Sequence, residues 1–167
     1  ALADFEMFLQ LGDDPELLAG VEALTGQMST GGGDFCFSGS TFANQAEAQA
    51  VVDNFNEATA DADDYNERGL AHDCLGIADR AIRDFSKALD INKTNGDYYQ
   101  NRGNVFIDLG QYTDAIRDYN SSLIYEPNNP VTYNNRGVAY GSNGQPAEAL
   151  NDYNQALELD SEYAMAY

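Results

Sequence analysis

Hydrophobic positions in the second half of the chain recur with the spacing of amphipathic helices. One stripe is formed by Ala115, Ile116, Tyr119 and Leu123, while Asp114, Arg117 and Asp118 fall beside it or on the opposite side. Such a stripe is typical of a helix that buries one face and leaves the other in water. The pattern therefore predicts helices of about three to four turns that pack against one another.

The whole pattern repeats every 34 residues without a slip in register. Eight columns of identical or similar residues keep this spacing. They are Tyr65, Tyr99, Tyr133 and Tyr167; Arg68, Arg102 and Arg136; Gly69, Gly103 and Gly137; Gly76, Gly110 and Gly144; Ala81, Ala115 and Ala149; Asp84, Asp118 and Asp152; Phe85, Tyr119 and Tyr153; and Leu89, Leu123 and Leu157. A period of this length is typical of a unit made of two helices and two short turns.

Glycine and proline mark the ends of the expected helices. Gly110 follows the first helix of its unit, where a left-handed cap favours glycine. Asn129 and Pro130 predict a helix start, with an N-cap residue followed by proline at the first helical position. Gly103 lies inside a helix, so we expect it to have a packing role, facing the small Ala115 and letting the two helices approach closely.

These columns resemble those of the tetratricopeptide repeat (TPR) family, over about 100 residues. The family's small-residue pair is present as Gly103 and Ala115, and its aromatic position in the second helix as Tyr119. The resemblance implies an all-α, right-handed superhelical solenoid of antiparallel helix pairs. Three units are expected at 62–95, 96–129 and 130–163, with the start of a further unit at 164–167.

The same columns reappear in part before residue 62. Residues 1–14 align with the second helix of a unit, so the chain is expected to open on an incomplete repeat. Residues 15–61 then form a degenerate repeat with helices near 15–28 and 43–59. Its extra length falls in a segment rich in Gly and Phe at 29–42.

The TPR resemblance also implies a concave groove lined by the first helix of each unit. No Lys or Arg falls at the implied positions, whereas amides and carboxylates are common there. Amides can bind a peptide backbone, and carboxylates favour a neutral or basic partner over an acidic one. The implied groove residues are Asp63, Asn66, Glu67, Leu70, Asp73 and Cys74; Asp97, Gln100, Asn101, Asn104, Ile107 and Asp108; and Val131, Asn134, Asn135, Val138 and Ser142.

Two pairings are expected to be structural. The Arg and Asp columns keep a constant separation of 16 residues, which predicts a ladder of exposed ion pairs: Arg68 with Asp84, Arg102 with Asp118, and Arg136 with Asp152. Cys36 and Cys74 either remain free thiols or form a disulfide that ties the insertion to the first full repeat. His72 stands where Phe106 and Tyr140 stand in later units, so it is interpreted as a packing ring.

Charge excludes several classes of function. The chain carries 28 Asp plus Glu against 8 Lys plus Arg, a formal net charge of −20. Residues 1–61 hold eleven of the acidic side chains and none of the basic ones. Nucleic-acid binding is excluded because it needs clustered Lys and Arg side chains. Membrane insertion is not expected either, because no run of residues is long and apolar enough to span a bilayer. No cofactor or metal site is expected. Asn92 and Asn120 fit the N-glycosylation pattern.

The sequence therefore favours a non-enzymatic scaffold that binds a protein segment. Enzymatic activity is not expected, because no set of acid, base, nucleophile or metal ligands is apparent. Two alternatives remain open: a structural subunit that assembles head to tail into a filament through uncapped ends, or a fragment of a longer array. Low Lys content and the possible Cys36 to Cys74 bridge favour an extracellular or surface setting, or a saline habitat.

Overall fold

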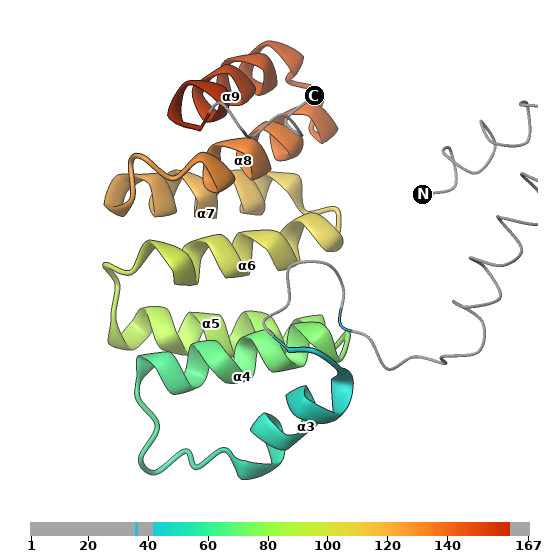
Figure 1. Ribbon diagram of the computed structural model, residues 1–167, viewed down its shortest axis with the longest axis vertical. Helices are drawn as coiled ribbons and strands as arrows, with labels where there is room; N and C mark the ends of the chain where they lie inside the picture. The colour runs from blue at the N-terminus through green and yellow to red at the C-terminus, as the bar shows by residue number, and fades with distance from the viewer. Residues whose placement is uncertain (1–35, 37–41, 161–167) are drawn as a thin grey trace, which may run out of the picture. The chain divides into compact units, whose positions relative to one another are not determined.

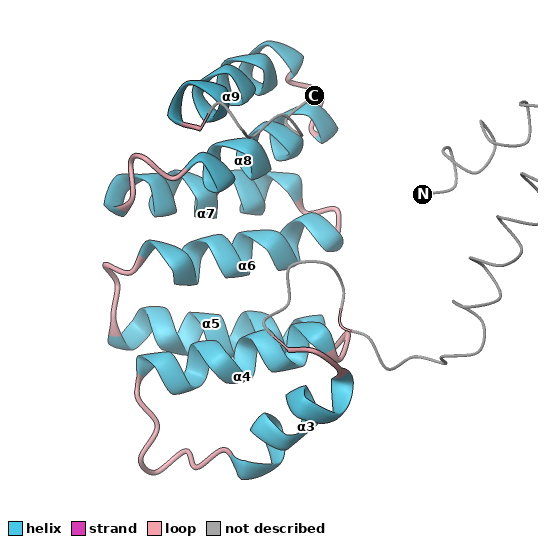
Figure 2. Cartoon of the chain, viewed as in Figure 1, coloured by secondary structure: helices cyan, strands magenta, loops and turns pink. Residues whose placement is uncertain are grey.

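A computed structural model describes Cys36 and residues 42–160, and that part of the chain is all-helical. Figure 1 shows its helices in chain order and Figure 2 their short connections. The helices are α3 (Gln45–Asn54), α4 (Ala62–Cys74), α5 (Ala78–Ile91), α6 (Gly96–Asp108), α7 (Tyr112–Tyr125), α8 (Pro130–Ser142) and α9 (Pro146–Leu159). No helix in this range has both the length and the apolar composition needed to cross a lipid bilayer.

The helices from α4 onward form successive pairs stacked along one axis (Figure 1). Helix α4 packs on α5, α6 on α7, and α8 on α9, while α5 and α7 join each pair to the next. The first helices also contact one another, α4 with α6 and α6 with α8, and among the described helices the second ones do not. The first helices therefore lie on the inner side of a solenoid, as the TPR resemblance implied.

Local signals set the ends of these helices. Gly76, Gly110 and Gly144 have φ angles of 71°, 69° and 78°, in the left-handed region that closes a first helix. Asp61 caps α4 in a capping box with Asp64. Asn129 caps α8 through its side chain, with Pro130 in the first turn. The repeated caps keep each turn short, so that consecutive helices run antiparallel.

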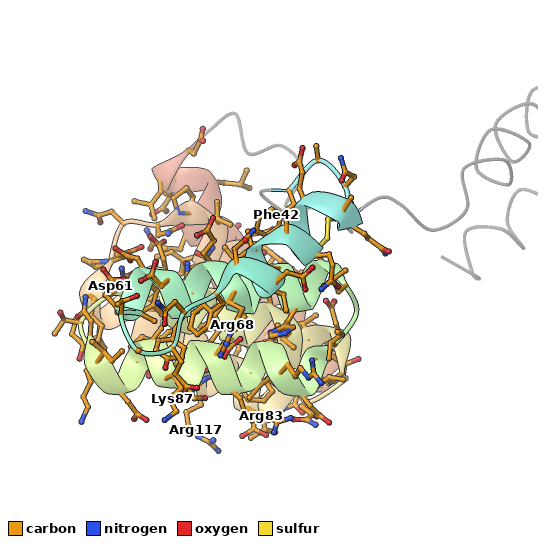
Figure 3. All side chains as sticks on the ribbon, turned by 90° about the horizontal axis from the view of Figure 1, so that it is seen from below. Phe42, Asp61, Arg68, Arg83, Lys87 and Arg117 are labelled. Atoms are coloured by element: carbon orange, nitrogen blue, oxygen red, sulfur yellow. A yellow bond between two sulfur atoms is a disulfide. The ribbon has the colours of Figure 1, made fainter. Side chains whose placement is uncertain are left out.

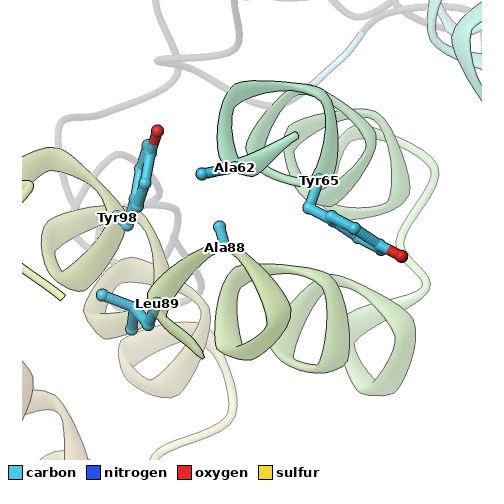
Figure 4. Close-up of a cluster of buried hydrophobic side chains, with 5 residues drawn as sticks. All are labelled: Ala62, Tyr65, Ala88, Leu89 and Tyr98. Atoms are coloured by element: carbon cyan, nitrogen blue, oxygen red, sulfur yellow. The ribbon is translucent and has the colours of Figure 1, made fainter. Parts of the chain in front are cut away.

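The core consists of small clusters that join one helix pair to the next. The cluster in Figure 4 unites α4, α5 and α6 through Tyr65, Leu89 and Tyr98. Phe85 and Tyr119 are completely buried between the helices of their own pairs. Because each cluster is contributed by neighbouring repeats, burial stabilises the stack rather than any isolated unit.

The nearest neighbour of the missing side chain of Gly103 is the ring of Tyr119, not Ala115 as expected. A Cβ atom on Gly103 would lie 2.8 Å from Cε1 of Tyr119, and Gly69 and Gly137 stand in the same relation to Phe85 and Tyr153. The missing side chain therefore makes room for an aromatic ring.

Helix α3 is shorter than the 43–59 expected from the sequence. It ends at Asn54, because Phe55 adopts an extended conformation and packs edge-on against Tyr65, with ring centroids 5.1 Å apart. Helix α3 itself packs on α4. The expected elements at 1–14, 15–28 and 164–167, and the insertion 29–42 apart from Cys36 and Phe42, lie outside the described residues.

Candidate groove on the inner face

The inner face of the stack contains a hollow of about 870 Å³ that extends along α4, α6 and α8. Its wall combines apolar side chains, amides and two carboxylates, and contains no Lys, Arg or His. The lining residues are Leu70, Asp73, Cys74, Gly76, Ala78, Gln100, Asn101, Asn104, Val105, Ile107, Asp108, Leu109, Tyr119, Val131, Asn135 and Val138. We refer to this hollow as the groove.

Most of the residues that the resemblance placed in a groove line this hollow, but some do not. Asp63, Asn66, Asp97, Asn134 and Ser142 are not part of its wall. Glu67 lines a separate hollow of about 400 Å³ between α3 and α4. This second hollow forms because α3 packs on the side of α4 where Glu67 lies.

The groove wall also contains residues that the sequence pattern did not indicate. Val105, Leu109 and Tyr119 line the groove although they were not expected to. Tyr119 belongs to the outer helix α7, but its hydroxyl reaches Asn104 Oδ1 at 2.8 Å. The aromatic column was the available signal, because a ring that passes beneath Gly103 can extend to the inner face.

The amides along the groove are engaged with one another across repeats. Asn101 Nδ2 donates to Asn66 Oδ1 at 2.9 Å, and Asn135 Nδ2 donates to Asn104 Oδ1 at 3.1 Å. Gln100 Oε1 accepts from the buried Thr132 hydroxyl. These bonds link α4 to α6 and α6 to α8, so the amides fix the spacing of the inner helices as well as facing the groove.

Asp63 is also engaged within the stack. The Tyr98 hydroxyl donates to Asp63 Oδ1, which joins α6 to the first turn of α4. Burial, followed by this bond, raises the pKa of Tyr98 to about 12. Asp63 is therefore a structural partner of Tyr98 rather than an open groove carboxylate.

Asp73 and Asp108 are the two carboxylates in the groove wall. Burial raises the pKa of Asp73 to about 6, and the nearby charge of Asp108 adds to the shift. Burial also raises the pKa of Asp108. Neither carboxylate forms a hydrogen bond or an ion pair with any described residue. The groove thus holds negative charge that the described part of the protein does not neutralise.

The Arg and Asp columns form a ladder of bidentate ion pairs between the helices of each pair. Arg102 Nε and Nη2 donate to Asp118 Oδ2 and Oδ1 at 2.7 and 2.8 Å. Arg68 binds Asp84 and Arg136 binds Asp152 in the same way. The expectation that these pairs are exposed is wrong, because the Asp118 side chain is only 5% accessible and that of Arg102 21%.

Two of the arginines also reach the preceding repeat. Arg102 Nη1 donates to Ser86 Oγ at 2.9 Å, and Arg136 Nη1 donates to Asn120 Oδ1 at 2.7 Å. The Arg68 guanidinium instead lies 3.5 Å from the centroid of the Phe55 ring. Arg68 lies between α4 and α5 in Figure 3, whereas Arg83, Lys87 and Arg117 project outward.

His72 is buried as expected of a packing ring, but it also extends the first step of the ladder. Its Nδ1 lies 2.8 Å from Asp84 Oδ2, while its buried Nε2 has no partner among the described residues. Burial lowers the pKa of His72 despite the contact with Asp84. The neutral ring therefore donates through Nδ1–H to the Asp84 carboxylate.

Cys36 and Cys74 are joined by a disulfide across 38 positions, with their Cα atoms 4.6 Å apart. The bridge is part of a cluster that contains Ala48 of α3 and Ala71 of α4, with Phe42 packed against it. Cys74 is 2% exposed and also lines the groove. The disulfide thus attaches the segment around Cys36 to the first inner helix.

The remaining candidate positions lie on the surface. Asn92 is the C-cap residue of α5, and Asn120 lies on the exposed side of α7. The described residues contain no group of three or more His, Cys, Asp or Glu side chains that could hold a metal ion.

Comparisons with known proteins agree with this architecture. Family models described as "TPR repeat" and "Tetratricopeptide repeat" match residues 103–144, 85–117 and 130–163. No curated protein sequence matches the chain.

Solved structures with similar folds include two TPR domains and the protein MamA. The TPR domain of Arabidopsis OM64 is 26% identical, with a TM-score of 0.61 over 63% of this chain and 87% of that one. The first TPR of Spaghetti (RPAP3), bound to the HSP90 peptide SRMEEVD, is 27% identical, with a TM-score of 0.59 over 60% and 79%. MamA is 25% identical, with a TM-score of 0.61 over 72% and 69%. The matched repeats and the shared fold together show that the chain is a tetratricopeptide repeat protein.

Proposed function

We propose that this protein is a non-enzymatic scaffold whose groove binds an extended segment of a partner protein. The observation that carries the proposal is the continuous hollow of about 870 Å³ along three successive inner helices. A hollow formed by several repeats suits a chain segment better than a small molecule, since it is long and open to solvent. The RPAP3 structure, with a peptide bound, is an example in a similar fold.

We further propose that the partner segment is neutral or basic. The peptide bound to RPAP3, SRMEEVD, is acidic. The groove described above has carboxylates and no base in its wall, so it would repel such a peptide. Fluorescence anisotropy with labelled SRMEEVD tests this proposal. We expect no binding at micromolar protein, and tight binding of this peptide would overturn the choice of partner charge.

The groove itself is tested by a matched pair of charge reversals on α6. Asp108 lines the groove, whereas Asp97 is exposed on the same helix and lies outside the wall. Affinity capture with Asp108→Lys should lose the partners that wild-type protein retains, and Asp97→Lys should keep them. Equal loss with both variants, or with neither, would place the binding site elsewhere.

Head-to-tail self-assembly is a second proposal, and it is supported by the exposed surface of α9. Ile82 and Ile116 each pack against a hydrophobic cluster that includes a residue of the following repeat. Leu150 of α9 occupies the same column of the repeat and is 51% exposed. A second copy, or a further repeat of a longer chain, would cover this face. Light scattering at increasing concentration tests self-assembly: growth that Leu150→Lys abolishes supports it, and a constant monomer mass contradicts it.

We also propose an oxidising setting, such as the extracellular space or a cell surface. The disulfide between Cys36 and Cys74 supports this, because such bonds persist mainly outside reducing compartments. Mass spectrometry of unreduced protein, alkylated on isolation from its source cells, would show two blocked thiols if the proposal is wrong.

A further inference from the structure

One end of the groove concentrates negative charge. Asp73 lies in the last turn of α4, and Asp108 is the last residue of α6. The C-terminal end of a helix carries a partial negative charge from its free carbonyl groups, so each carboxylate adds to the field of its own helix. The last turn of α6 has no basic residue, and the last turn of α4 has only His72, the neutral ring that donates to Asp84. The charge at this end is therefore not offset by the helices that carry it.

The basic residues of the chain are committed elsewhere. Arg68, Arg102 and Arg136 bind the Asp column, and Arg117 binds Asp114 on the outer helix α7. The other four bases, Arg80, Arg83, Lys87 and Lys93, lie on α5 or directly after it, and none of them lines the groove. A cation that neutralises Asp73 and Asp108 must accordingly come from outside the described chain.

Apolar side chains share the groove wall with the two carboxylates. Leu70 lies three residues before Asp73 on α4, and Ile107 directly precedes Asp108 on α6. Val138 of α8 lines the same wall and is 40% exposed. Asp73 is half-buried, which makes its interaction with a bound cation stronger than at an open surface, whereas Asp108 is exposed on the same wall. The apolar side chains can hold the aliphatic stem of a long basic side chain or a neighbouring apolar residue.

We propose that the groove selects a partner segment by a Lys or Arg side chain that binds Asp73 and Asp108, with an apolar side chain of the same segment packed on Leu70, Ile107 and Val138. This inference rests on the proposed function, because it names the chemistry that the groove recognises. It commits to an extended basic and apolar segment as the occupant, on the grounds of charge complementarity with the groove wall.

The test uses a displayed library of random ten-residue peptides, selected on three forms of the full chain. The forms are wild type, Asp73→Asn plus Asp108→Asn, and the matched control Asp79→Asn plus Asp90→Asn, which removes the same charge from the exposed side of α5. Circular dichroism establishes that all three are equally helical. One arginine-containing peptide selected by wild type is then resynthesised with citrulline, a neutral analogue of arginine, and all affinities are measured by titration calorimetry.

We expect wild type and the control to enrich Lys or Arg at one position beside an apolar residue. Citrulline should weaken binding to wild type by about tenfold or more and leave binding to Asp73→Asn plus Asp108→Asn nearly unchanged. Peptides that bind the groove without a basic residue, or that lose equal affinity in both double variants, would overturn this inference and leave the proposed function intact. If no selected peptide loses binding when Asp108 is replaced by Lys, both this inference and the proposed function are overturned.

Discussion

Gly103 packs against the ring of Tyr119, so closely that a Cβ atom on the glycine would lie 2.8 Å from Tyr119 Cε1. The ring is fully buried between α6 and α7. The same contact is made in the neighbouring pairs by Gly69 with Phe85 and by Gly137 with Tyr153. The distance between the two helices of each pair is therefore set by an aromatic ring held against a bare helix backbone.

Alanine at position 103 should accordingly destabilise the protein. Adding a methyl group to a helix glycine normally stabilises, but overpacking against a buried ring costs about 1–3 kcal/mol. Gly141 provides the matched control on α8, since a Cβ atom there would meet only Ala149 Cβ at 3.9 Å. We expect Gly141→Ala to raise the free energy of unfolding in urea by about 1 kcal/mol. The packing role of Gly103 would be refuted if both variants were stabilised.

Removal of a ladder carboxylate should cost far more than removal of a surface one. Asp118→Ala leaves the partly buried Arg102 guanidinium without its bidentate partner, so we expect a loss of about 2–4 kcal/mol. Asp114→Ala breaks the ion pair with Arg117, whose side chain is 70% exposed, and should cost about 0–1 kcal/mol. Urea unfolding of the two variants provides the comparison, and similar losses would mean that burial adds nothing to the ladder.

Reduction of the disulfide should destabilise the attachment of α3 to α4. A crosslink that spans 38 positions removes chain entropy from the unfolded state worth about 4 kcal/mol. We expect urea unfolding to shift to lower concentrations when a reductant is added, and the shift to disappear in the variant Cys36→Ser plus Cys74→Ser. If the urea unfolding transition of the wild-type protein does not shift when reductant is added, the disulfide does not stabilise the fold.

His72 should make stability sensitive to mild acid. Burial lowers its pKa in the folded state below the ordinary value of 6.5, so the unfolded chain binds the proton more readily. Stability from the neutral ring is thus present above pH 6.5 and is lost as the pH falls toward the folded pKa. The variant His72→Phe, which copies Phe106 of the next repeat, lacks this loss. In urea unfolding, the free energy of unfolding of this variant relative to wild type should therefore rise as the pH is lowered from 7.5 to 5.5. A difference that stays constant over this range would contradict the assignment.

The 34-residue period predicted the helices and their glycine caps well, because both depend on local chemistry that every repeat shares. It also placed Arg102 and Asp118 on facing helices. It could not show that Asp118 is buried or that Gly103 meets Tyr119, because a repeat phase identifies columns but not which side chain crosses between helices. The groove amides illustrate the same limit: Asn101 and Asn66 occupy neighbouring columns, and only the stacking of α6 on α4 brings them into hydrogen-bond distance.

Binding of a basic peptide to the groove should strengthen as the pH rises through about 6. In the free protein the pKa of Asp73 is raised to about 6 by burial and by Asp108, so the carboxyl is mostly protonated below that pH. A bound Lys or Arg favours the ionised form, and the proton must then be released on binding. Below the pKa, affinity should fall by up to about tenfold per pH unit, and above pH 7 it should level off. Titration calorimetry of an arginine peptide between pH 5 and pH 8 measures this dependence. The variant Asp73→Asn should weaken the slope, because it leaves only Asp108 to titrate in the groove; an identical slope in this variant would assign the pH dependence to another group.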